Sequence, residues 1–167
     1  MQTLLDLFST FETAGSKVAF VNRTGLRRLE VSYAALHDLA LKMANLLAQN
    51  GVVPGDRVLI WAPNSSWWAV AWWGIILRGA VAVPVDFMSD LTRAESIRNL
   101  TSARLVLQSR FKQDLIVTAP SLLLENLQYL LEDQQQIRGI TTAVPEDTAQ
   151  LIYTSGTTGN PKGVVLT

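Results

Sequence analysis

The stretch that decides the fold is residues 57–85, which read RVLIWAPNSSWWAVAWWGIILRGAVAVPV. Residues 57–62 and 80–85 are apolar runs without alternation, which is typical of strands covered on both faces of a parallel sheet. Between them, the Pro-Asn-Ser-Ser of 63–66 supplies a helix start and the Arg-Gly of 78–79 a helix stop. This strand–helix–strand order predicts one unit of a doubly wound α/β sheet.

The helix between these strands is apolar on every face. A helix of this kind is normally buried inside a larger protein. Its apolar run, 67–77, is too short for a membrane span, which needs about 20 apolar residues. We therefore expect buried core, with contact to a membrane or a partner surface as the less favoured alternative. Its tryptophans are expected to pack in that core, although they could also line a fatty-acid site.

Upstream of this unit, the pattern predicts further helices and strands. Leucine and phenylalanine recur at helical spacing over 2–13, and residues 17–22 and 29–31 are typical of short strands around a turn. Ser32 is a good N-cap for a helix that runs to about Asn50.

Downstream, the same alternation continues with a helix over 92–99 and a strand over 104–108. Residues 115–132 allow a strand and then a helix, whereas the polar segment 132–147 is typical of a loop or linker. The order of elements indicates a doubly wound, mostly parallel sheet flanked by helices, and no linker divides the chain into two domains.

The composition excludes several functional classes. The 167 residues carry no net charge, so neither a nucleic acid nor another polyanion is an expected partner. The absence of cysteine excludes disulfides and thiolate metal sites. The N-terminus lacks a basic segment followed by an apolar core, so no secretory signal is expected, and a cytoplasmic location is the default. Hydrophobic residues make up 49% of the chain and charged residues 17%. This composition is more apolar than is usual for a free-standing soluble domain.

The most informative segment for function is residues 151–167, LIYTSGTTGNPKGVVLT. Glycines in such a loop allow positive φ and a close approach of the backbone to a ligand. Successive N–H groups can form an anion-binding nest, to which hydroxyl groups and one mobile lysine add donors. The candidate phosphate-binding residues are Thr154, Ser155, Gly156, Thr157, Thr158, Gly159 and Lys162.

The spacing excludes the common P-loop, which requires G-x-x-x-x-G-K-[ST] followed by a helix. Here Pro161 precedes Lys162, Gly163 follows it, and residues 164–166 are typical of a strand. The sequence therefore predicts a strand–loop–strand hairpin around the candidate phosphate loop.

Residues 153–163, YTSGTTGNPKG, resemble the signature loop of the adenylate-forming superfamily. That superfamily includes acyl-CoA synthetases, luciferases and the adenylation domains of peptide synthetases. Weaker similarities at 31–36, 51–58 and 79–86 precede the loop in the family's order. The resemblance implies that residues 1–167 are part of the large N-terminal AMP-binding domain, with the C-terminal domain absent.

This resemblance implies a reaction in which a small carboxylic acid and ATP form an acyl-adenylate and pyrophosphate. The acyl group then passes to a thiol of coenzyme A or of a phosphopantetheine carrier protein. The threonines and the serine of the loop would bind the β- and γ-phosphates, the glycines would let it fold over them, and Lys162 would add charge. Mg²⁺ is expected to bridge the phosphates.

The resemblance also implies that the adenine site, most of the acyl pocket, a metal-binding acid and a catalytic lysine lie outside this chain. No catalytic residue and no metal ligand is therefore assigned within it, and the chain alone is expected to be inactive without the remainder of the ligase. The alternative is a truncated, non-catalytic module that binds a nucleotide or a partner. Residues 61–64 and the apolar helix favour fatty or aryl acids over amino acids as substrates.

Other polar residues are expected to have structural roles. His37, the only histidine, lies on the helix that starts at Ser32, and a helix-surface or packing role is expected. Asp86 and Asp90 are explained by a turn followed by a helix cap. The remaining acidic candidates are expected to form an ordinary solvated face; they are Glu125, Glu132 and Asp133.

Overall fold

The computed structural model describes residues 3–24, 27–154 and 162–167. The strands of the main sheet are β3 (Arg57–Trp61), β4 (Val81–Pro84), β5 (Leu105–Gln108), β6 (Ser121–Leu123), β7 (Gln150–Thr154) and β8 (Lys162–Leu166). They lie in the order β6-β5-β3-β4-β7-β8, and each neighbouring pair is parallel except β7 and β8. The expected doubly wound, mostly parallel sheet is confirmed.

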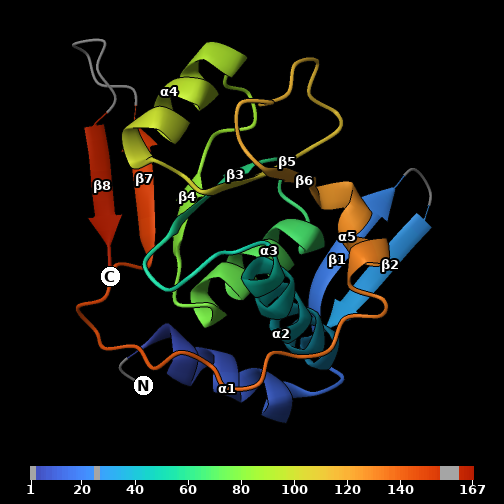
Figure 1. Ribbon diagram of the computed structural model, residues 1–167. Helices are drawn as coiled ribbons and strands as arrows, with labels where there is room; N and C mark the ends of the chain where they lie inside the picture. Colours follow the sequence, from blue (N-terminus) through green and yellow to red (C-terminus); the bar gives the residue numbers. More distant parts are fainter. Residues whose placement is uncertain (1–2, 25–26, 155–161) are drawn as a thin grey trace.

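Helices cover both faces of this sheet (Figure 1). The helices are α1 (Leu4–Ala14), α2 (Tyr33–Gln49), α3 (Ser66–Leu77) and α4 (Leu91–Thr101). Alternate strand residues serve two cores, because successive side chains of a strand point to opposite faces. Val58 and Ile60 pack in the core with α1, α2 and α3, whereas Leu59 and Trp61 pack in the core with α4. This two-sided burial explains why β3 reads as a continuous apolar run.

The tryptophan-rich helix α3 is buried as predicted. Its N-cap is Ser65, whose side chain accepts a hydrogen bond from the backbone N–H of Trp68 at 3.1 Å. None of its 12 residues is exposed. Within the described ranges, the structure contains no helix whose length and apolar character would let it cross a membrane.

A separate antiparallel hairpin, β1 (Val18–Thr24) and β2 (Arg27–Ser32), lies beside the helical layer. Two hydrogen bonds join it to α3: Asn22 Nδ2 donates to Ser66 Oγ at 2.6 Å, and Ser66 N donates to Asn22 Oδ1 at 3.3 Å. The predicted cap of α2 is present, since Ser32 Oγ accepts from Ala35 N at 3.1 Å.

The region between β5 and β7 matches the predicted order in shorter pieces. The strand β6 is followed by a 3₁₀ turn, Leu124–Asn126, and by the short helix α5 (Leu127–Leu130). Residues 132–147 form neither helix nor strand, as expected for a loop. They are not a free linker, however, because Gln136 Nε2 donates to Asp38 Oδ1 at 2.8 Å and Ile137 N donates to Leu41 O at 3.3 Å.

Candidate functional site: the carboxyl edge of the sheet

The hairpin β7–β8 flanks the candidate phosphate loop. Its strands are antiparallel, with Thr154 and Lys162 paired across the ladder. Thr154 is the exposed last residue of β7, and a strand rather than a helix follows the loop, so the predicted strand–loop–strand arrangement is confirmed. The side chain of Lys162 lies outside the described part of the structure. So do the remaining candidate residues, which are Ser155, Gly156, Thr157, Thr158 and Gly159.

A hollow lies next to this hairpin. Because β3, β4 and β7 are parallel, their carboxyl ends lie at one edge of the sheet, where ligands bind in open α/β sheets. The hollow, about 450 Å³ in volume, is lined by the segments that follow β3 and β4, by α3 and by the end of β7: Ala62, Pro63, Asn64, Trp68, Pro84, Val85, Asp86, Phe87, Ile152 and Tyr153.

Tyr153 connects the hollow to the hairpin. It lines the hollow and packs against the core that contains Leu59 and Val83. Across the hairpin it pairs with Gly163, where an added Cβ would lie 3.2 Å from Tyr153 Cζ. Gly163 therefore leaves room for the ring of Tyr153, which extends from β7 to β8. The sequence signal for this contact is an aromatic residue opposite a glycine across the predicted hairpin.

The acidic residues after β4 have the structural roles that the sequence predicted. Asp86 Oδ1 accepts a hydrogen bond from Met88 N at 2.9 Å, which closes a turn. Asp90 is the N-cap of α4, and its Oδ1 accepts from Arg93 N at 2.8 Å. Asp86 also lines the hollow, which sequence reasoning did not anticipate.

Of the two structural roles expected for His37, packing is the one observed. Its ring stacks on Phe8, with 4.7 Å between ring centroids. The aromatic core of the helical layer also contains Trp73, whose ring meets Phe11 edge to face at 5.1 Å. Packing therefore accounts for most of the tryptophan-rich helix, while Trp68 also borders the hollow.

The expectation that Glu125 belongs to a solvated face is wrong. Its Oε1 accepts from Ser109 Oγ at 2.6 Å, and its Oε2 accepts from Arg110 N at 3.0 Å. The side chain is only 23% exposed. The chain after β5 returns beside the 3₁₀ turn that carries Glu125, and periodicity along the sequence cannot show that proximity.

The described part of the candidate loop offers one hydroxyl donor, that of Thr154. The exposed hydroxyl of Thr154 stands at the carboxyl edge, where it can donate to a phosphate oxygen. In the parts of the chain that the structure describes, no three His, Cys, Asp or Glu side chains are grouped so that they could hold a metal ion.

Comparison with known proteins agrees with this geometry. A family model described as AMP-binding enzyme matches residues 7–167. The chain is 34% identical over 140 residues to gramicidin S synthase 2 of Brevibacillus brevis, an alignment that spans 83% of this chain and 3% of that synthetase. Several other relatives are named nonribosomal peptide synthetases, so the relatives do not support the preference for acyl-CoA synthetases.

Solved structures share the fold. The N-terminal subdomain of Klebsiella oxytoca NpsA, in complex with 3-hydroxybenzoyl-AMSN, matches with a TM-score of 0.82 and 22% identity, over 99% of this chain and 41% of that one. A fatty acyl-adenylate ligase from L. pneumophila, in complex with acyl adenylate and pyrophosphate, matches with a TM-score of 0.81 and 26% identity, over 99% and 30%. Since the family model spans nearly the whole chain, the chain belongs to the AMP-binding enzyme family.

Proposed function

We propose that residues 1–167 supply the phosphate-binding part of an enzyme that joins a carboxylic acid to the α-phosphate of ATP, with release of pyrophosphate. The observation that carries this proposal is the position of the β7–β8 hairpin. Ile152 and Tyr153 of β7 line the hollow at the carboxyl edge, and Thr154, the next residue, pairs with Lys162 across the hairpin. That edge is where open α/β sheets bind nucleotides.

The proposed roles follow from the charges in the reaction. The attacking carboxylate and ATP are both anions, and negative charge grows on the departing pyrophosphate, so donors fixed around it lower the barrier. In the proposal, Gly156 and Gly159 let the backbone approach the phosphates, and Lys162 supplies a positive charge. Mg²⁺, when bound, would neutralise phosphate charge. The hydroxyl donors to the β- and γ-phosphates would be Thr154, Ser155, Thr157 and Thr158.

We infer a fatty or aryl acid as the substrate. The aromatic side chains around the hollow support this inference; they are Trp68, Phe87 and Tyr153. An amino acid is the alternative, and the peptide-synthetase relatives favour it. The acceptor of the acyl group would be a thiol, either of coenzyme A or of a phosphopantetheine carrier protein.

The test of the reaction is ATP–pyrophosphate exchange by the protein expressed from its own gene, with a panel of fatty, aryl and amino acids. Exchange that depends on one acid class supports adenylation and identifies the substrate. Residues 1–167 should be assayed in parallel, because we propose that they bind phosphate without completing the reaction. Nucleotide binding without exchange by the gene product would instead indicate the non-catalytic alternative.

Lys162→Ala should lower the exchange rate by about a hundredfold, the scale seen when one donor to a developing charge is removed. The thermal midpoint should change little. Lys17→Ala provides a matched control, because Lys17 is an exposed lysine between α1 and β1. Wild-type exchange in the Lys162 variant would rule out the assigned role of this lysine.

A further inference from the structure

Lys112 makes an unusual set of contacts next to the hollow. Its Nζ donates to the backbone carbonyls of Phe87 and Ser89, both at 2.8 Å. The same nitrogen lies 4.4 Å from the ring centroid of Trp61 and 5.0 Å from that of Phe87, within the range of cation–π attraction. A lysine on the segment after β5 thus holds the backbone of the segment after β4.

The acceptors are neutral. Among the ion pairs of the described residues, none involves Lys112. Hydrogen bonds from a charged donor are stronger than neutral ones, so two carbonyls that converge on one ammonium group are fixed firmly. Two hydrogen bonds to Asp86 close the turn that carries these two carbonyl groups. Met88 N donates to Asp86 Oδ1 at 2.9 Å, and Ser89 N donates to Asp86 O at 2.9 Å.

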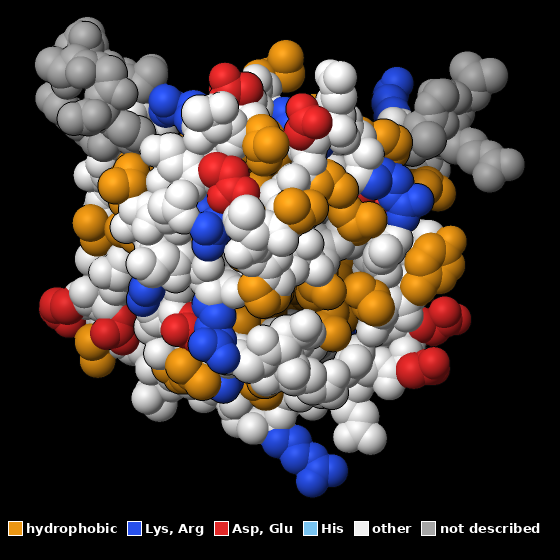
Figure 2. All heavy atoms as spheres, turned by 45° about the horizontal axis from the view of Figure 1, so that its top comes forward, with side chains coloured by type: hydrophobic (Ala, Val, Ile, Leu, Met, Phe, Trp, Pro, Cys, Tyr) orange, Lys and Arg blue, Asp and Glu red, His pale blue; other side chains and the backbone are white. Residues whose placement is uncertain are grey.

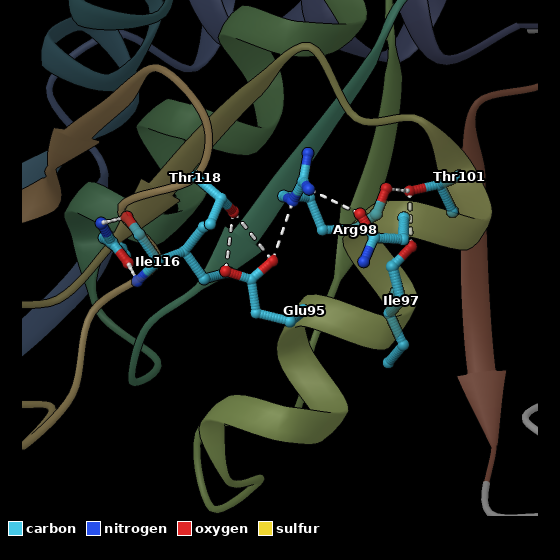
Figure 3. A network of polar contacts seen from close by, with 8 residues as sticks. Glu95, Ile97, Arg98, Thr101, Ile116 and Thr118 are labelled. Atoms are coloured by element: carbon cyan, nitrogen blue, oxygen red, sulfur yellow. Dashed lines mark hydrogen bonds and ion pairs between the residues drawn. The ribbon is translucent and has the colours of Figure 1, made fainter.

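The segment that carries Lys112 is itself anchored, although residues 109–120 form no helix or strand. The buried Gln108 side chain donates to Ile116 O at 3.0 Å and accepts from Ile116 N at 2.9 Å. Thr118 Oγ1 donates to Glu95 of α4 at 2.7 Å, and Glu95 also pairs with Arg98 at 3.0 Å (Figure 3). Lys112 therefore projects from a segment held at both ends.

We propose that Lys112 is a positioning residue for the signature hairpin. It fixes residues 86–89, of which Asp86 and Phe87 form one wall of the hollow. Tyr153 of β7 lines the same hollow and packs against the core that contains Trp61 and Val85, and its ring lies next to Gly163 of β8. The position of the β7–β8 hairpin thus depends on Lys112 through this wall. The expected effect of Lys112 on ATP binding rests on the proposed function. Its effect on the position of the β7–β8 hairpin does not.

The test compares Lys112→Met with Lys112→Arg in the protein expressed from its own gene. Methionine keeps the apolar stem and removes the charged donor, whereas arginine keeps a cation that can donate to two carbonyls and stack on aromatic rings. We expect Lys112→Met to raise the KM for ATP about tenfold, as a small misplacement of binding groups does. The KM for the acid should stay within twofold of wild type, and Lys112→Arg should restore most of the ATP affinity. Lys17→Met is the matched control and should leave both constants unchanged.

Hydrogen exchange followed by mass spectrometry provides the second measurement. Lys112→Met should speed exchange of the amides of 86–89 and of β7–β8, with α2 unchanged. Faster exchange confined to 86–89, or equal changes in both KM values, would overturn the proposal. If wild-type protein exchanges no pyrophosphate with any acid, the proposed function fails, and the hydrogen-exchange pattern still decides whether Lys112 positions the hairpin.

Discussion

Ser102 shows how a single residue can hold an unfavourable backbone conformation. It ends α4 at φ +50° and ψ +43°, the left-handed region, and is the one described residue other than glycine with positive φ. Its N–H donates to the carbonyls of Arg98 and Asn99, so the conformation closes the helix end. Glycine is the usual residue at such a position, because a side chain there is strained.

Ser102→Gly should therefore stabilise the protein, by about 0.5 kcal/mol, since the relief of about 1 kcal/mol of strain exceeds the added entropy of the unfolded chain. Urea unfolding should show a higher midpoint with an unchanged slope. Ser102→Ala keeps the Cβ and should show no gain. Equal stabilisation by alanine and glycine would mean that the backbone conformation is not the cause.

At the scale of elements, the contact between α2 and α3 depends on Gly74. A Cβ at this position would lie 2.4 Å from Met43 Cγ, 2.7 Å from Met43 Cβ and 3.2 Å from Ala44 N. These distances are far below van der Waals contact, so one of the two helices would have to move. The glycine lowers the helix propensity of α3 but allows the close approach that buries both helices.

Gly74→Ala should destabilise the protein by about 2 kcal/mol, because overpacking outweighs a gain in helix propensity of about 1 kcal/mol. Met43→Ala should also be destabilising, since it leaves a cavity. The double variant should be less unstable than the sum of the two, because loss of Met43 Cγ removes the shortest overlap and the added Cβ fills part of the cavity. Additive free energies of unfolding would contradict the proposed contact.

At the scale of the molecule, the β7–β8 hairpin is attached to the sheet by few bonds. Its register with β4 consists of the single pair Ala82–Gln150, next to a hydrogen bond from Ala82 N to Ala149 O at 3.0 Å. A side-chain bond from Trp72 Nε1 to Gln150 Oε1, 2.6 Å long, ties the hairpin to α3. The hairpin is therefore expected to open without unfolding the rest of the sheet.

Gln150→Ala should speed amide exchange in β7 and β8 about fivefold, which corresponds to the loss of about 1 kcal/mol for one hydrogen bond. Exchange in α2 and β3 should stay at the wild-type rate. Gln134→Ala is the control, because Gln134 bonds to Asn45 and Gln49 of α2, away from the hairpin. A uniform acceleration along the chain would show that the hairpin opens only with global unfolding.

The surface at this scale is mixed. On the face that Figure 2 brings forward, hydrophobic side chains are interspersed with acidic and basic ones. The segments near the carboxyl edge contribute exposed apolar residues, among them Met88 at 82% and Phe111 at 72%. Met88 lies in the turn that Lys112 holds, and Phe111 precedes Lys112 in the chain. Such exposed apolar side chains agree with the apolar composition of the sequence.

Much of the fold could be predicted from the sequence, because the decisive signals are local. The serines at 32 and 65–66 mark helix starts, and the apolar run over 57–62 marks a strand buried on both faces. The Pro-Lys-Gly of 161–163 excludes a helix after the loop, and β8 is a strand. In each case, a few neighbouring residues fix the backbone conformation or the side that is buried.

Only the tertiary structure decided which segments meet at the carboxyl edge. The carbonyl groups that Lys112 holds lie 25 and 23 residues away in the sequence, and Glu125 reaches Ser109 over 16 residues. Tyr153 borders the same hollow as Trp68 because β4 and β7 are neighbours in the sheet. Periodicity reports whether a residue is buried, but the order of strands determines its partners, and that order depends on the packing of the whole chain.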